Sequence, residues 1–131
     1  MTKIIRKIKL RQYQFENGTL VENTFKKIVQ ESKHFFVSKF DPRVVRGNHY
    51  HRRKSEWFYL IQGTCKVCVI DLKTKQKEEF ILKDRQNLML NFKPNIAHAF
   101  KNVGKNETIL LALVNEVHDQ NDPDTYRYKL L

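Results

Sequence analysis

Apolar and polar residues alternate along most of the chain, in short stretches separated by turn-forming residues. Between residues 3 and 10, Ile4, Ile8 and Leu10 are spaced among lysines and an arginine, which places the apolar side chains on one face of a half-buried β-strand. Similar patterns predict strands over residues 19–21, 24–29, 34–40, 56–62, 64–71, 78–82, 88–92, 97–103 and 108–115. Because no long stretch has the period of an amphipathic helix, the sequence predicts an all-β protein.

Turn signals such as Asn17-Gly18, Asp41-Pro42 and Gln62-Gly63 separate these stretches. Many short strands at regular spacing are typical of a sandwich or jelly-roll barrel, whose mouth can enclose a ligand. With 131 residues, the chain is long enough for one domain with a real core but not for two. We therefore expect a single domain over residues 1–131, with the polar tail 118–126 packing across the barrel and not extending it.

The balance of charge is strongly basic, since 25 Lys and Arg stand against 14 Asp and Glu, a net charge of +11. A positive balance favours an anionic partner such as a nucleotide or phosphate. The basic residues are scattered, however, so solubility explains the charge equally well. Nucleic acid is the least expected partner, because no strand pattern of interleaved basic and aromatic residues is present.

The start of the chain is charged and alternating, and no apolar run approaches the roughly 18 residues of a membrane span. We therefore expect neither a signal peptide nor a membrane partner, and a cytoplasmic protein. Cys65 and Cys68 stand three apart in a predicted strand, so their thiols point to opposite faces. Without a second cysteine pair or a strand-to-helix turn, the sequence indicates two reduced strand cysteines, at least one of them buried.

Four residues with metal-binding side chains carry the candidate chemistry: His49, His51, Glu56 and His98. Residues two apart on a strand face the same side, so His49 and His51 are expected to share one space. Glu56, beyond a polar turn, can reach that space from the next strand, and it alternates with apolar residues. Three imidazoles and a carboxylate suit a divalent transition metal such as Zn, Fe, Mn or Ni. The alternative is ordinary strand histidines; His34 and His118 have no register with the set and are taken as incidental.

The spacing His-x-His-x4-Glu-x6-Gly, followed by the distant His98, resembles the cupin superfamily over residues 43–115. This resemblance implies a double-stranded β-helix, the cupin jelly-roll barrel. Several positions depart from the superfamily pattern. In the second motif Pro94 is shifted by one, and an earlier Gly is replaced near Leu88. Arg43 stands where an opening Gly is common, and Asn95 stands at the Gly of the second motif. Asn tolerates a positive φ better than most residues, so we expect the turn at Asn95 to survive.

A narrower resemblance rests on Arg46-Gly47-Asn48-His49-Tyr50-His51. The chain is similar here to cupins that act on nucleotide-linked 4-keto-6-deoxy sugars, the 3,5-epimerases and 3,4-ketoisomerases. Residues 115–119 and 122–126 also resemble the end of the C-terminal cupin of capsular-polysaccharide epimerase/reductases, which epimerises a UDP-linked 4-keto sugar and carries a metal. The resemblance implies an isomerase or epimerase in surface polysaccharide or deoxysugar biosynthesis, with a nucleotide-sugar substrate.

Two mechanisms fit that resemblance. In the epimerases the histidine matching His49 is the base that removes the acidified proton beside the ketone, so His49 and His51 are the candidate catalytic residues. If His49 binds a metal instead, the metal polarises the carbonyl, and the base is water or another residue. The candidates for that acid–base role are Tyr59, Tyr126 and Tyr128. The predicted substrate contacts at the rim are Arg46, Arg52 and Arg53, since Arg binds phosphate oxygens in a fork geometry.

Two other functions use the same residues. A metal-dependent oxygenase needs the His/Glu set with open coordination positions, and a non-catalytic sugar-binding or metal-binding cupin needs only the pocket. We also expect a homodimer. The strand over residues 3–10 would leave an edge exposed in a monomer, and pairing across a two-fold axis would cover it.

Overall fold

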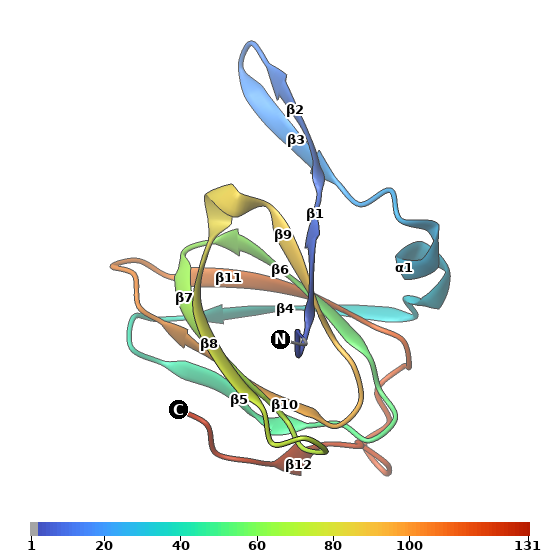
Figure 1. Cartoon of the computed structure of the whole chain (residues 1–131). Helices are drawn as coiled ribbons and strands as arrows, with labels where there is room; N and C mark the ends of the chain where they lie inside the picture. The colour runs from blue at the N-terminus through green and yellow to red at the C-terminus, as the bar shows by residue number, and fades with distance from the viewer. Residues whose placement is uncertain (1–2) are drawn as a thin grey trace.

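The computed structural model describes residues 3–131 and consists mainly of antiparallel strands (Figure 1). The elements are β1 (Arg6–Lys9), β2 (Arg11–Phe15), β3 (Gly18–Glu22), α1 (Lys26–Glu31), β4 (His34–Phe40), β5 (Val45–Tyr50), β6 (Glu56–Gln62), β7 (Thr64–Asp71), β8 (Lys77–Lys83), the 3₁₀ turn η1 (Asp84–Gln86), β9 (Leu88–Phe92), β10 (Ile96–Asn102), β11 (Thr108–Val114) and β12 (Tyr126–Arg127). The first sheet has the order β1-β9-β6-β11-β4 and the second β12-β5-β10-β7-β8. Strands β2 and β3 form a separate hairpin.

The two sheets face one another and enclose a single apolar interior. Alternate residues of the strands supply it, as in β6, where Glu56, Phe58 and Leu60 point inward and all are buried. The largest buried side chains of this core include Phe92, Phe100, Leu60 and Leu90. The predicted all-β jelly-roll barrel is confirmed, and most of its strands begin and end within a residue or two of the predicted limits.

One predicted strand was wrong, because residues 24–29 contain the start of helix α1. The backbone makes helical hydrogen bonds from Val29 N–H to Phe25 O and from Ser32 N–H to Ile28 O. Only Ile28 is buried in this helix, and it packs with Ile8 and Trp57 on the outer face of the first sheet. A short apolar run does not distinguish a strand from a helix by period alone, so tertiary packing decided the outcome.

The N-terminal strand forms as expected and lies at the edge of the first sheet. β1 pairs with β9 of the same chain, from Arg6 opposite Asn91 to Lys9 opposite Leu88, and pairing of its other edge across a dimer stays a prediction. The hairpin β2–β3 then projects away from the barrel (Figure 1). It leaves Tyr13, Phe15 and Leu20 exposed.

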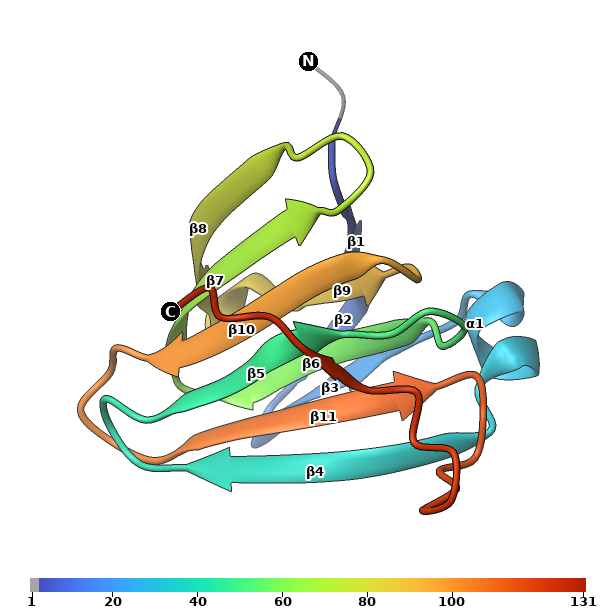
Figure 2. The same ribbon diagram turned by 90° about the horizontal axis from the view of Figure 1, so that it is seen from below.

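The C-terminal tail was expected to pack across the barrel without extending it, and this was wrong in part. Tyr126 and Arg127 pair with Tyr50 and His49 and so extend the second sheet beyond β5. Figure 2 shows this last segment running alongside β5. Asn48 holds the end of the chain, since its side chain accepts hydrogen bonds from the N–H groups of Leu130 and Leu131.

A β-bulge in β5 sets the direction of the side chains that line the barrel. The register between β10 and β5 shifts between His98, opposite His49, and Ala99, opposite Gly47. Gly47 has φ +95°, and a Cβ there would lie 2.7 Å from the carbonyl oxygen of His98. Because the bulge inserts one residue, Arg46 faces the barrel together with its partner Phe100, although Arg46 and His49 are an odd number of residues apart.

Both cysteines are free and buried, as predicted for at least one of them. Cys65 belongs to the barrel core, and burial raises the pKa of its thiol to about 11. Among residues 3–131, no helix is long and apolar enough to cross a membrane.

Candidate active site

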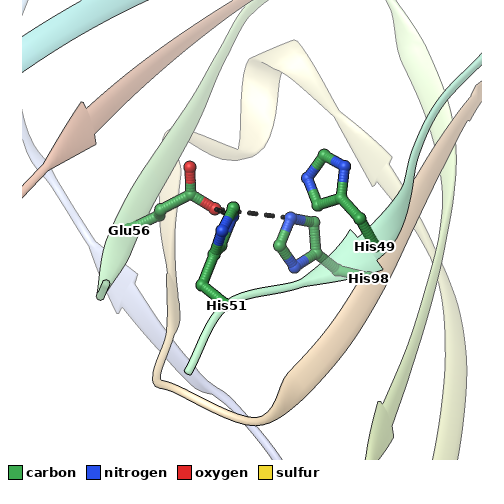
Figure 3. A group of neighbouring side chains, drawn as sticks. All are labelled: His49, His51, Glu56 and His98. Carbon is green, nitrogen blue, oxygen red and sulfur yellow. Dashed lines mark ion pairs between the residues drawn. The ribbon is translucent and has the colours of Figure 1, made fainter. Parts of the chain in front are cut away.

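Four predicted residues meet at one point inside the barrel (Figure 3). His49 is on β5, His51 follows that strand directly, Glu56 opens β6, and His98 is on β10. One ligand atom from each lies within 4.8 Å of every other. The strands explain this convergence, because His98 is directly opposite His49 in the ladder and the short loop after His51 turns the chain back into β6.

The ligand atoms of the site are enclosed and aim at each other. Glu56 is 4% exposed and His98 is 1% exposed. Glu56 Oε1 lies 3.0 Å from His51 Nε2 and 3.4 Å from His98 Nε2. Yet none of these three buried atoms has a hydrogen-bond partner of acceptable geometry within the described chain. Since buried polar atoms normally have partners, this cluster is incomplete as a purely protein network.

Burial and charge set the protonation states of the cluster. Burial lowers the pKa of His49 to about 4, and the charges of His98 and His51 act in the same direction. Burial also lowers the pKa of His98. For Glu56, burial raises the pKa, but the nearby histidines outweigh it and the net pKa is lowered. For His51, burial lowers the pKa, but the close contact and charge of Glu56 outweigh it and the net pKa is raised.

These states fit a divalent cation. A metal needs neutral imidazoles and an ionised carboxylate, and His49, His98 and Glu56 are already in those forms at neutral pH. Because its pKa is raised, His51 is the ligand at which a proton would compete most with the metal. Three buried ligand atoms without a hydrogen-bond partner surround one point, and a cation bound there would satisfy them. Imidazole nitrogen and carboxylate oxygen ligands suit Zn, Fe, Mn or Ni. The four residues therefore form a group that could hold a metal.

The far sides of two histidine rings are fixed by backbone carbonyls, an arrangement common around metal-binding histidines. His51 Nδ1 lies 2.7 Å from the carbonyl oxygen of Asp124, and His98 Nδ1 lies 3.3 Å from that of Ile96. The His98 ring also stacks on Phe92, with centroids 4.5 Å apart. Both histidines therefore present Nε2 to the centre of the cluster.

Asp124, in the C-terminal tail, supports the loop that joins His51 to Glu56. Its carboxylate accepts hydrogen bonds from the backbone N–H groups of Arg52, Arg53 and Lys54, at 2.9–3.1 Å. The residue is buried and has φ 52°, a conformation that Asp tolerates better than most residues. Sequence reasoning missed this role, because Asp124 is distant in sequence from the residues it holds.

A cavity of about 360 Å³ opens beside the cluster, between β4, the end of β5 and the C-terminal tail. Its walls include His49, His51, Glu56, His34, Phe36, Lys54, Val114, His118 and Thr125. His34 and His118, which the sequence analysis placed out of register with the cluster, thus lie in the wall of the cavity beside it. The missed signal was the alternation of β4, which gives His34 the same parity as the buried Phe40.

The predicted substrate contacts differ in their surroundings. Arg46 is exposed, and its guanidinium lies 5.9 Å from the ring of Phe40. Arg52 stacks over the ring of Tyr126 at 4.2 Å. Arg53 is already paired with Glu116 at 2.8 Å and with Asp122 at 3.2 Å, so its charge is balanced within the chain.

The three tyrosines considered as acids lie away from the cluster. Tyr59 is on the outward-facing side of β6, and its hydroxyl donates to Asn87. Tyr126 stacks on Tyr50, and Tyr128 contacts the same ring. None of the three lines the cavity beside the four-residue cluster. The structure therefore gives these three tyrosines no contact with the cavity beside the cluster.

Comparison with known proteins supports the assignment of the fold. Residues 14–126 match the family model described as polysaccharide biosynthesis C-terminal domain. The chain is 30% identical over 96 residues to UDP-2-acetamido-2,6-beta-L-arabino-hexul-4-ose reductase of Pseudomonas aeruginosa. That match covers 73% of this chain and 26% of the relative, so the chain spans about a quarter of the length of that reductase.

Solved structures give the same picture. The capsular polysaccharide assembling protein of Staphylococcus aureus aligns with a TM-score of 0.72 and 22% identity, covering 92% of this chain and 34% of that one. A dTDP-4-dehydrorhamnose 3,5-epimerase of Bacillus anthracis, with TDP and PPi bound, aligns with a TM-score of 0.80 and 19% identity, covering 94% and 77%. A sugar 3,4-ketoisomerase of Thermoanaerobacterium thermosaccharolyticum, in complex with TDP, gives 0.80 and 21%, covering 97% and 90%.

At sequence identities of 19–22%, the likeness to solved structures establishes the fold alone. The match to the family model establishes the family. The second motif keeps its geometry despite its departure from the superfamily pattern, since Asn95 has φ 67° as expected. Arg43, at the position of the common opening Gly, also has a positive φ of 71°. The chain has the cupin fold and belongs to the polysaccharide biosynthesis C-terminal domain family.

Proposed function

We propose that this protein is an isomerase or epimerase of a nucleotide-linked 4-keto-6-deoxy sugar, acting in surface polysaccharide or deoxysugar biosynthesis. The observation that carries the proposal is the enclosed cluster of His49, His51, Glu56 and His98 beside a cavity of about 360 Å³, whose wall includes the first three of them. Such a cavity is at the small end of ligand pockets and suits a sugar ring, with the nucleotide outside. The proteins of similar fold include sugar epimerases and a ketoisomerase.

Binding begins at the rim in this proposal. Arg46, which the bulge of β5 places opposite Phe100 on the inner face of the second sheet, is the proposed contact for the pyrophosphate, with Arg52 as a second cation near the tail. Both are exposed and reach solvent, where an anionic ligand would arrive. Arg53 is left out of the proposed contacts because Glu116 and Asp122 already bind it. The net charge of +11 favours the approach of a diphosphate.

The cluster would activate the sugar. His49, His51, Glu56 and His98 would hold a divalent cation, which as a Lewis acid would polarise the ketone and so acidify the neighbouring C–H. The residues around the cluster exclude water and keep the rings fixed, through Phe92 against His98 and Asp124 against His51. His49 contributes a ring nitrogen to the cluster, and its pKa is lowered to about 4. Because this makes His49 a weak base, we assign it to binding the cation.

The proposal is tested with purified protein, its metal content measured by elemental analysis, incubated with UDP- or dTDP-4-keto-6-deoxyglucose in deuterated water. Enolisation predicts deuterium at C3, or at C3 and C5, of the recovered sugar, detected by mass spectrometry. His49→Asn should abolish exchange, whereas Arg46→Ala should chiefly raise KM. Absence of exchange with either substrate, from protein with its native metal content, would favour a binding protein without catalytic activity.

A further inference from the structure

His34 lies on the wall of the cavity next to the four-residue cluster. In the first sheet, His34 is directly opposite Val114, and Val114 is directly opposite Glu56. Val114 and Glu56 are both buried inside the barrel, so the three residues share the inner face. With neighbouring strands about 4.8 Å apart, the backbone of His34 is roughly 10 Å from that of Glu56. A sugar ring bound at the cluster would therefore have His34 beside it.

One hydrogen bond fixes the form of the His34 ring. Its Nδ1 lies 3.3 Å from the carbonyl oxygen of Glu116. A carbonyl only accepts, so Nδ1 is the donor, and in the neutral ring Nε2 keeps its lone pair. No hydrogen bond within residues 3–131 involves this Nε2. The residue is half-buried, so solvent can exchange a proton held there.

The other polar groups of the cavity are less suited to accept a proton. His49 and His51 point their nitrogens at the cluster, and Lys54 Nζ donates to the carbonyl of Pro123 at 3.0 Å. His118 is exposed, and among the described residues no hydrogen bond orients its ring. His34 is thus the imidazole at the cavity that is both outside the cluster and held in place by a hydrogen bond.

We propose that His34 is the general base that removes the proton from C3 of the 4-keto sugar. The C3–H bond breaks as the Nε2–H bond forms. The electrons of the C3–H bond become the second bond between C3 and C4, and the carbonyl electron pair moves to the C4 oxygen to give an enolate. The proton on Nε2 exchanges with water and returns to C3, so deuterium from the solvent enters that carbon. This inference rests on the proposed function.

The test uses His34→Asn, because the Asn amide nitrogen takes the place of Nδ1 and keeps the bond to Glu116 while Nε2 is lost. General-base catalysis typically contributes about 10²–10⁴-fold, so we expect kcat for C3 exchange to fall by at least about 100-fold. KM, metal content and the melting temperature should change little. In His34→Ala, added imidazole should restore exchange in a saturable manner. Lys39→Ala, an exposed change on the opposite face of β4, is the control.

These experiments distinguish the proposed role of His34 from the proposed function of the protein. If the wild-type protein exchanges C3 and His34→Asn does so at a similar kcat, His34 is not the base and the proposed function stands. If both His34 variants lose activity together with metal or thermal stability, and imidazole restores nothing, the role of His34 is structural and the proposal is overturned. If the wild-type protein itself shows no exchange, both claims fall.

Discussion

Replacing Gly47 with alanine perturbs the bulge on which the site depends. The backbone there has φ +95°, and the new Cβ would lie 2.7 Å from His98 O and 3.1 Å from Ala99 Cα. A non-glycine residue in such a conformation costs about 1–3 kcal/mol. The contact with the backbone of β10 adds to this cost, since no flexible side-chain end can move away. We expect a loss of about 3 kcal/mol in the free energy of unfolding.

For a domain of this size such a loss lowers the melting temperature by roughly 10 °C. Because the clash falls on the carbonyl of His98, metal affinity should weaken together with stability. Thermal and urea unfolding measure the first effect, and metal titration measures the second. The control is Gly18→Ala, where a Cβ would meet nothing within 4 Å and φ is not positive. A Gly47→Ala protein within about 0.5 kcal/mol of the control would refute the role given to the bulge.

Four further changes probe other parts of the molecule. His49 has a pKa lowered from 6.5 to about 4, so the unfolded chain binds a proton that the folded chain does not; between those pH values the metal-free protein should lose up to about 3 kcal/mol of stability as pH falls, and urea unfolding should show a smaller loss in His49→Asn. Arg43→Gly should unfold at higher temperature than Arg43→Ala, by up to about 1 kcal/mol in stability, because φ is 71°; equal stability would contradict this reasoning. Asp124→Asn should cost about 2 kcal/mol and weaken metal binding, because a carboxylate that accepts three backbone N–H groups is lost; unchanged metal affinity in a titration would argue against a link between the tail and the cluster. Phe35, 66% exposed on the outer face of β4, is expected at the surface of a homodimer, so Phe35→Glu should shift the mass in light scattering toward the monomer, and a wild-type monomer at micromolar concentration would contradict the dimer.

The fold and the four-residue cluster were predictable because both depend on local periodicity. Residues two apart on a strand share a face, so His49 and His51 had to be neighbours, and the alternation of Glu56 with Phe58 and Leu60 placed its carboxylate inside. His98 followed from the cupin spacing. These relations do not depend on how the remaining segments of the chain fold.

The contacts that complete the site depend on segments that meet only after folding. Nothing in the local pattern of Asp124 indicates that it holds the loop after His51, and His34 enters the cavity through the pairing of β4 with β11. The bulge at Gly47 changes the parity of Arg46, which simple alternation cannot anticipate. The helix at Lys26–Glu31 also depends on a tertiary contact, because Ile28 packs against residues of the first sheet.

The proposed enolisation of a nucleotide-linked 4-keto sugar by this chain can be measured directly. Proton NMR of the wild-type protein with UDP- or dTDP-4-keto-6-deoxyglucose in deuterated water follows the C3–H signal of the sugar directly. Enolisation predicts that this signal disappears in the presence of the wild-type protein and persists in the presence of His49→Asn. Persistence of the C3–H signal with the metal-replete wild-type protein, for both nucleotides, would contradict it.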